Sequence, residues 1–451
     1  MSPFDNFDAL EVITKNTVGM NIGNMVFPYS MHRTLMTDDV QIDMIRTDLR
    51  KTKADVDYFN SEYSCLVLPF ATAFRTSYLK QLKTVASLVR SLSIPCVVTG
   101  VGVGSGVGWK GSFEEEMEIS PELDEAVIDF MKSILEKSSM IGIRGEITGK
   151  YLSQLGFKEE RDFTVIGCPS MFLHGSELPK FNVPELTPAS AVSITGKITL
   201  PKAFCEFFVR SMGQFENCHY VPQVLDEISM MYVGCPYPGN KTKISKMYKM
   251  NQIPKGYPIS PCDETYLSGK GISFINVPSW LDYFKTKEFS FGSRIHGTIA
   301  GILGGVPSYI TVSDSRTLEL AEYHNIPHIS VNDLKKDTTI FDLHERADFS
   351  ALHRGHSDRF NHFIEFLNKN GLDHIYKDGG VVKNSPFDQK IASINFNGPL
   401  HPLFSVSAEE QAERLEKFFT YYNKKVHSLK KQNESSYKQS LKKIIKRFKG
   451  K

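Results

Sequence analysis

The chain is short of the features that mark secreted or membrane-spanning proteins. Its seven cysteines are an odd number, and no two of them form a C-x-x-C pair. This pattern argues against a disulfide framework and against a structural zinc site. No apolar run reaches the roughly 18 residues that span a bilayer, and the first residues, MSPFDNFDALEV, lack the basic and apolar regions of a signal peptide. We therefore expect a reduced, cytoplasmic protein without a required metal ion.

A dinucleotide-binding motif is also missing, although one stretch suggests it at first sight. Five glycines alternate with other residues between Gly100 and Gly108, directly after an apolar run. None of them has glycine partners two and five residues later, so the G-x-G-x-x-G spacing is absent. Gly102 and Gly104 remain candidates for direct contact with a ligand, and the alternative is a backbone turn that glycine permits.

Net charge is small, but its distribution is uneven. The chain has 53 Lys and Arg against 51 Asp and Glu, a net charge of +2. Residues 423–451 hold eleven of the basic residues and one acid, which leaves 42 basic and 50 acidic residues elsewhere. Because the body is acidic, we expect no nucleic-acid partner.

The basic tail has the pattern of an amphipathic helix. Its last part places four apolar residues on one face, with Lys and Arg around them: Leu441, Ile444, Ile445 and Phe448. Such a helix suits an anionic leaflet, so residues 423–451 predict peripheral attachment to the inner face of the cell membrane. The alternative is a disordered tail that keeps the protein in solution.

Apolar runs alternate with helical patterns along most of the chain. In the first 180 residues, the predicted strands are 65–68, 94–99 and 140–143, and the predicted helices are about 76–92, 121–137 and 146–155. After a proline-rich linker, the predicted strands are 191–196, a run from 219, and 272–277, with a helix near 201–213. Strands separated by helices of this length indicate parallel sheets.

These patterns predict an α/β protein with two doubly wound, Rossmann-like domains that face a cleft, followed by C-terminal helices. The predicted units are an N-terminal domain at 1–180, a C-terminal domain at 181–375, a helical extension at 376–422 and the basic tail at 423–451. A polar insert at about 234–270 is long for a loop in a compact domain and predicts a substrate loop.

The stretch from Phe289 to Ile329 carries the clearest chemical signal. Arg294 and His296 stand where a strand-like run gives way to a helical pattern. Cations at the carboxyl end of a strand, beside a helix N-terminus, lie where α/β sheets usually bind anions. Ser313-Asp314-Ser315 then begin another helix, which carries Arg316 in its first turn.

This stretch resembles the signature of the polysaccharide pyruvyltransferase family, R-x-H-x-x-I followed by G-x-P and D-x-R-x-x-E-L. The matching residues are Arg294, His296, Ile299, Gly305, Pro307, Asp314, Arg316, Glu319 and Leu320. Upstream, the segment Ile141–Glu146 resembles the family's strand and R-[DG]-E helix, and Gly167–Ser170 stands where many members have an Asp-Pro-Ala-like segment. Gly19–Asn24 departs from the family's N-x-G-D pattern, because it lacks the acid.

The resemblance implies a GT-B-like pair of domains with a donor site for phosphoenolpyruvate. Guanidinium groups suit both its carboxylate and its phosphate, so Arg144 and Arg294 would hold it from the two sides of the cleft. Ser293 and Arg316 are further candidates for binding it. His296 would protonate the enol carbon, with a pKa lowered by the helix N-terminus and Arg294. Alternatively, His296 caps its helix.

The arginines also have structural alternatives. Arg144 could form an ion pair with Glu146 or with Asp162, both close to it in sequence. Arg316 could pair with Glu319 on its own helix, because the two are three residues apart. A side chain occupied in this way would not be available to a substrate.

The sequence therefore predicts an enzyme that transfers pyruvyl from phosphoenolpyruvate to two hydroxyls of a saccharide, without a cofactor. The product would be a cyclic ketal on a cell-surface polysaccharide or on its lipid-linked precursor. One alternative is a GT-B sugar-nucleotide glycosyltransferase, although Pro327 stands where the second acid of an E-x(7)-E element beginning at Glu319 would be. The other alternative is a non-catalytic saccharide-binding or assembly protein.

Overall fold

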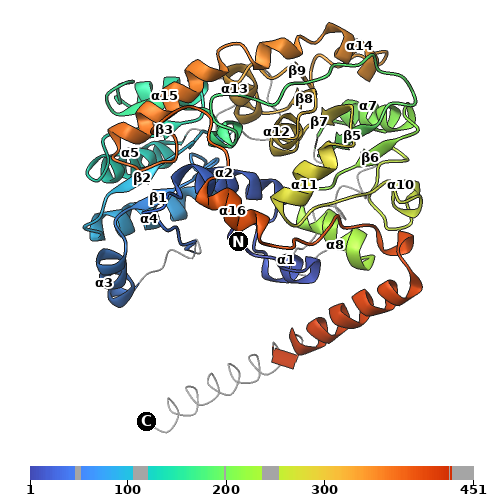
Figure 1. Ribbon diagram of the computed structural model, residues 1–451, viewed down its shortest axis with the longest axis horizontal. Helices are drawn as coiled ribbons and strands as arrows, with labels where there is room; N and C mark the ends of the chain where they lie inside the picture. The colour runs from blue at the N-terminus through green and yellow to red at the C-terminus, as the bar shows by residue number, and fades with distance from the viewer. Residues whose placement is uncertain (46–51, 105–119, 198–199, 236–252, 426, 429–451) are drawn as a thin grey trace, which may run out of the picture.

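The computed structural model of the chain contains two α/β units (Figure 1). It describes residues 1–45, 52–104, 120–197, 200–235, 253–425 and 427–428. Most of the basic tail and part of the 234–270 insert lie outside the described residues. All strand pairs within the sheets are parallel, which confirms the predicted fold class.

The first unit is built on short parallel strands. They are β1 (Leu66–Leu68), β2 (Cys96–Val98), β3 (Ile141–Ile143) and β4 (Phe163–Val165). β1 pairs with β2 and β3 pairs with β4, while a parallel bridge between Val101 and Ile143 joins the two pairs. The helices of this unit are α3 (Lys53–Glu62), α4 (Leu79–Ser91), α5 (Pro121–Leu135) and α6 (Glu146–Gln154). Strands and helices thus alternate as the sequence predicts.

The second unit contains a five-stranded sheet in the order β6-β5-β7-β8-β9. Its strands are β5 (Val192–Thr195), β6 (Cys218–Tyr220), β7 (Phe289–Gly292), β8 (Ser308–Val312) and β9 (His328–Ser330). Its helices are α7 (Lys202–Gly213), α8 (Leu225–Val233), α10 (Glu264–Leu267), α11 (Val277–Phe284), α12 (Ile295–Leu303), α13 (Ser315–Tyr323) and α14 (Ile340–Arg346). Among the described residues, no helix has the length and apolar character needed to cross a bilayer.

One predicted strand of this unit is wrong. The run 272–277 contains only an isolated bridge between Ser273 and Leu400, and Gly271 just before it bridges Tyr220, so the run is not a strand of the sheet. The chain turns into α11 there, because Asn276 caps this helix by accepting a hydrogen bond from the Ser279 N–H, and Pro278 stands in the first turn.

Both ends of the chain cross between the two units. Helix α1 (Ala9–Lys15) packs on α8 of the second unit. Helix α15 (His356–Lys369) instead packs against the first unit, where Phe363 and Phe366 share a buried cluster with Val97 of β2. Figure 1 shows α15 beside β3 and α5, and α1 beside α8. Hydrophobic burial therefore ties the two units to each other.

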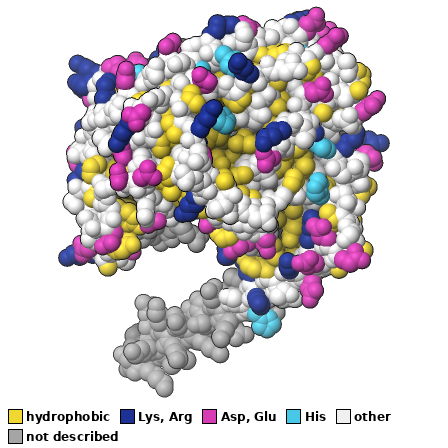
Figure 2. All heavy atoms as spheres, viewed as in Figure 1, with side chains coloured by type: hydrophobic (Ala, Val, Ile, Leu, Met, Phe, Trp, Pro, Cys, Tyr) yellow, Lys and Arg dark blue, Asp and Glu magenta, His cyan; other side chains and the backbone are white. Residues whose placement is uncertain are grey.

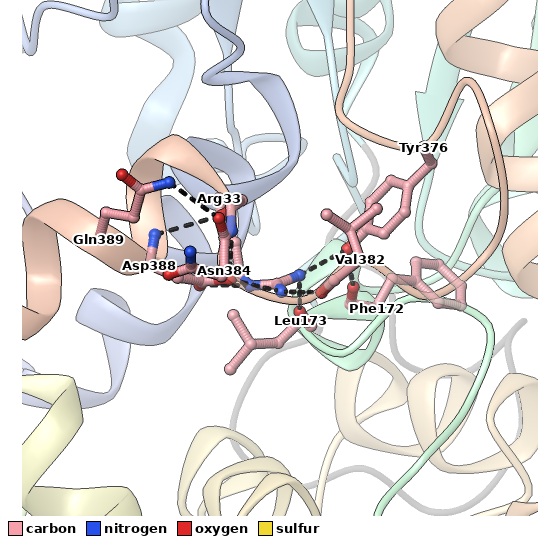
Figure 3. Close-up of polar contacts among 9 residues, drawn as sticks. Arg33, Phe172, Leu173, Tyr376, Val382, Asn384, Asp388 and Gln389 are labelled. Atoms are coloured by element: carbon pink, nitrogen blue, oxygen red, sulfur yellow. Dashed lines mark hydrogen bonds and ion pairs between the residues drawn. The ribbon is translucent and has the colours of Figure 1, made fainter.

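Arg33 holds the segment 376–388, which follows α15, in place against α2 (Val26–Leu35). Arg33 lies on this helix, and its side chain is nearly buried. Its five N–H groups donate to Asp388 at 2.8 and 2.9 Å, to the carbonyls of Leu173 and Val382 at 2.8 and 2.7 Å, and to the Tyr376 hydroxyl at 3.0 Å (Figure 3). The whole guanidinium fork is satisfied, so this buried charge is compensated.

Replacing this arginine should destabilise the protein strongly. We expect Arg33→Met to lower the free energy of unfolding by about 3 kcal/mol, because it leaves Asp388 and two carbonyls without their donor. The control is Arg90→Met, whose exposed ion pair with Asp129 should contribute less than about 1 kcal/mol. Urea unfolding measures both, and equal losses in the two variants would contradict the buried network.

Candidate functional site

The candidate site lies where strands of both units end. In the second unit, β7 is followed by Arg294 and His296, and β8 is followed by Asp314 and Arg316. In the first unit, β3 ends directly before Arg144. The carboxyl ends of parallel strands are the usual position of binding sites in α/β proteins. Residues far apart in the sequence are thereby brought together between the units.

Arg144 is a buried cation with unsatisfied donors. Its side chain is 1% exposed, and its Nη1 lies 3.4 Å from the Thr72 hydroxyl. Its Nε and Nη2 have no hydrogen-bond partner among the described residues. Burial lowers the pKa of Arg144 to about 10. A guanidinium group in this state carries a desolvation cost that a bound anion would offset.

The ion pairs that the sequence offered as an alternative for Arg144 do not form. Glu146 pairs with Lys150 at 2.9 Å, and Asp162 pairs with Arg161 at 2.6 Å. Both carboxylates point to cations on the surface of their own unit, where exposed partners are easily reached. The alternative is therefore wrong for Arg144.

Arg316 and Lys197 add positive charge opposite Arg144. They share Asp314, whose Oδ2 lies 3.6 Å from Arg316 Nη2 and 3.5 Å from Lys197 Nζ. Burial would raise the pKa of Asp314, but Arg316 and Lys197 lower it to about 2. One carboxylate thus serves two cations, and the Arg316 Nε has no partner among the described residues. The alternative for Arg316, an ion pair with Glu319, does not form among the described residues, because Arg316 pairs with Asp314.

His296 lies in the first turn of α12, at the point where these charges meet. It is partly buried, and burial together with Arg144 and Arg316 lowers the pKa of its imidazole to about 3. The lowered pKa agrees with the sequence prediction, whereas the cations responsible are Arg144 and Arg316 and not Arg294. The backbone of Arg294 is the N-cap of α12, without a side-chain cap, so His296 does not cap its helix.

Arg294 lies beside this group of charges. Its Nε donates to the Gly196 carbonyl at 2.9 Å. Burial lowers the pKa of the neighbouring Lys197, and the positive charges of Arg316 and Arg294 lower it further. The neighbouring Ser293 has a buried hydroxyl with no partner among the described residues. Lys197 was missed by sequence reasoning, although it follows the end of β5 in the same way that Arg294 follows β7. The clamp between Arg144 and Arg294 stays a prediction.

Gly102 and Gly104 lie where a larger residue would collide with neighbouring side chains. A Cβ on Gly102 would lie 2.8 Å from Arg144 Cδ and 3.0 Å from Glu319 Oε1. A Cβ on Gly104 would lie 2.8 Å from the Thr72 methyl group. Glycine at 102 therefore allows Arg144 to approach Glu319, while 105–108 lie outside the described residues.

Glu319 is a functional candidate whose partner the sequence did not reveal. It accepts hydrogen bonds from the Thr148 N–H at 3.0 Å and from the Thr148 hydroxyl at 3.0 and 3.1 Å. Thr148 is the third residue of α6, so a carboxyl group from the second unit caps a helix of the first. Burial raises the pKa of Glu319 to about 7, although Arg144 and Thr148 act to lower it.

The arrangement favours a small ligand with more than one negative charge. Arg316 and Lys197 pair with Asp314, and Arg144 and Arg316 act on the imidazole of His296. The described residues contain no group of three His, Cys, Asp or Glu side chains that could hold a metal ion. Unpaired guanidinium donors can bind carboxylate or phosphate oxygens in a bidentate fashion. A histidine beside them can transfer a proton to such a ligand.

Comparison with known proteins decides the family. The sequence pattern of the family described as polysaccharide pyruvyl transferase matches residues 21–315, more than half of the chain. The chain belongs to the polysaccharide pyruvyl transferase family. The match includes Arg144, Arg294 and His296, whereas Arg316 and Glu319 lie just beyond it. No curated protein matches the chain in sequence.

Solved structures give weak similarity. A functionally uncharacterised protein of Klebsiella pneumoniae has a TM-score of 0.36 and 11% identity, covering 68% of this chain and 88% of its own. The glycosyltransferase of kitacinnamycin has a TM-score of 0.29 and 12% identity, with coverages of 71% and 75%. MurG of Acinetobacter baumannii has a TM-score of 0.32 and 10% identity, with coverages of 73% and 84%.

The raised pKa of Glu319 predicts how stability depends on pH. The folded protein holds the Glu319 proton more tightly than the unfolded chain, so this group stabilises the fold below about pH 4.5. That contribution is lost as the pH rises through about 7, and it amounts to about 3 kcal/mol. We expect Glu319→Gln to be more stable relative to the wild type at pH 8 than at pH 5, as measured by urea unfolding.

The matched control for this prediction is Glu322→Gln. Glu322 lies on the same helix and is exposed, so its replacement should leave the pH profile of stability unchanged. Comparing each variant with the wild type removes the contributions of other titrating groups, including His296. Parallel profiles for wild type and Glu319→Gln would show that the buried carboxyl does not titrate in this range.

Proposed function

We propose that this protein transfers pyruvyl from phosphoenolpyruvate onto two hydroxyls of one saccharide. The observation that supports this most is the buried guanidinium of Arg144, whose Nε and Nη2 lack partners among the described residues. Arg316 and Lys197 lie opposite with a single shared carboxylate. Phosphoenolpyruvate carries a carboxylate and a phosphate, so it would supply acceptors for both sides of the site.

In this proposal, His296 protonates C3 of the enol, which creates a cation at C2. Two saccharide hydroxyls then form bonds to C2, and the C2–O bond to phosphate breaks. One of the two hydroxyl protons goes to His296 and restores the proton that it gave to C3. The other hydroxyl proton goes to the leaving phosphate. The products are a cyclic ketal with a methyl group and a carboxylate, together with hydrogen phosphate. No oxidant or reductant is needed.

The low pKa of His296 sets a condition for this step. In the ligand-free protein, burial together with Arg144 and Arg316 lowers the pKa of the imidazole, so the ring is neutral at ordinary pH. A bound phosphate and carboxylate would compensate these cations and raise the pKa of the ring. The acid would therefore be charged when the donor is in place, which limits unproductive protonation in its absence.

The test is pyruvyl transfer by the purified protein. Incubation with phosphoenolpyruvate and cell-derived glycans should release phosphate and add pyruvyl to the glycan, as detected by mass spectrometry. We expect His296→Asn to lower the rate by about 100-fold or more, while phosphoenolpyruvate still raises its thermal midpoint. Arg144→Met should lose that thermal shift. His401→Asn, at an exposed position, should behave as the wild type.

The same experiments separate the alternatives. Stabilisation by a uridine or guanosine diphosphate sugar, and not by phosphoenolpyruvate, would favour a sugar-nucleotide glycosyltransferase. A non-catalytic role predicts that the pyruvyl content of cellular glycans is the same with wild type and with His296→Asn. Absence of product over a broad panel of acceptors would contradict pyruvyl transfer.

We also propose that the C-terminal tail attaches the protein to the inner face of a membrane, where a lipid-linked acceptor would be found. The helix at 408–425 leads into this tail, and its exposed side chains include Phe419 at 55% and Tyr422 at 42%. The helix packs on the body through Arg414, which lies over the Tyr232 ring. On the face of the body in Figure 2, basic and acidic side chains are interspersed, so the tail is the main candidate for an anionic surface.

Truncation tests this attachment. A chain ending at Asn423 should no longer sediment with anionic liposomes but should keep its turnover on a soluble acceptor. Each Lys or Arg near an anionic surface contributes about 1 kcal/mol, screened by salt, so full-length protein should be released as salt increases. Neutral liposomes are the control. Equal sedimentation of both proteins at low salt would assign the tail a solubilising role.

A further inference from the structure

Cys168 lies within the site, although the reaction outlined above does not use it. It is 1% exposed and precedes the short helix η3 (Pro169–Phe172). Its Sγ lies 4.0 Å from His296 Nε2, at the outer limit of a sulfur hydrogen bond, and 3.2 Å from the Ser170 hydroxyl. The thiol and the imidazole come from different units, so their contact is a product of the fold.

The backbone around Cys168 is held firmly. Its N–H donates to His324 Nε2 at 2.9 Å, and the next carbonyl, of Pro169, accepts a hydrogen bond from the Ser30 hydroxyl at 2.8 Å. Gly167 has a φ of +68°, and a side chain there would clash with His324 and Tyr323. The thiol therefore keeps its place beside His296 independently of any ligand.

The electrostatic surroundings leave both partners neutral. Burial raises the pKa of the Cys168 thiol, and Arg144 opposes this only in part. The charged groups that act on His296 are Arg144 and Arg316. The helix η1 (Ile22–Met25) packs against α12 and places Gly23, which carries no charge, next to the Cβ of His296. A neutral thiol can donate to a neutral imidazole, or accept from it, without adding charge.

We propose that Cys168 is a positioning residue for His296, whose thiol holds the Nε2 side of the ring beside the anion site at Arg144. The buried nitrogens of Arg144 that lack a partner among the described residues support a ligand at this point of the fold. A thiol orients the ring without adding charge, whereas a carboxylate at the same place would raise the pKa of the ring whether or not a ligand is bound. The effect of Cys168 on catalysis rests on the proposed function, whereas the contact between Cys168 and His296 does not.

Nuclear magnetic resonance of the histidine rings tests the contact without any substrate. The His296 signals are identified by their loss in His296→Asn. In the wild type and in Cys168→Ser, they should show a neutral ring between pH 5 and 8. In Cys168→Asp, the carboxylate should raise the proton affinity of the ring by about tenfold or more, so the ring begins to titrate. Identical titrations in wild type and Cys168→Asp would overturn the proposal.

Kinetics test the positioning role. Cys168→Ala should lower kcat by about 10- to 100-fold, part of what a general acid contributes, with KM for phosphoenolpyruvate changed less than about threefold. Cys168→Ser should restore most of kcat. The control is Cys96→Ala, an equally buried cysteine far from the site, which should keep wild-type kcat. Equal kcat for Cys168→Ala and Cys96→Ala would overturn the positioning role of Cys168. If the wild type were inactive, the proposed function would be refuted, and the titration of the His296 ring would then decide whether Cys168 contacts it.

Discussion

The hydrogen bonds of Glu319 to Thr148 set the geometry on which the site depends. They connect α13 of the second unit to the first turn of α6, directly after Arg144. Because Arg316 stands three residues before Glu319 on α13, the same contact fixes Arg316 relative to Arg144. The approach requires Gly102 and Gly145, since a side chain at either position would collide with Glu319. Two glycines and one buried carboxyl group thus define the distance between the units.

This geometry leaves the site with an excess of positive charge. Glu319 uses its oxygens on Thr148, and Asp314 is shared by Arg316 and Lys197. Arg144 therefore has no carboxylate partner within ion-pair distance among the described residues, and two nitrogens of its buried guanidinium have no hydrogen-bond partner there. The fold tolerates this cost because other contacts, such as the fully satisfied Arg33 network, stabilise it elsewhere. A dianionic ligand would supply acceptors for the nitrogens of Arg144 and Arg316 that have no partner among the described residues.

The sequence predicted the alternation of strands and helices because hydrophobic periodicity is a local property. It also placed Arg144, Arg294 and His296 at strand ends, since the strands before them were recognisable. It could not predict that Glu319 binds Thr148, because nothing in the spacing of α13 identifies a partner from the other unit. The error at 272–277 has a similar cause, since the cap at Asn276 overrides an apolar run that is compatible with a strand.

Helix α2, which no pattern in the sequence identified, is the support behind the site. Ser30 holds the Pro169 carbonyl, and Arg33 holds the Leu173 carbonyl, so α2 fixes the loop on both sides of η3. The same arginine binds Asp388 of α16 (Pro386–Ala392), which anchors the returning chain to this helix. The position of Cys168, and through it the ring of His296, therefore depends on a buried charge whose partners come from two distant parts of the sequence, Leu173 and the segment 376–388. Local patterns describe each part, but their meeting is a consequence of tertiary packing alone.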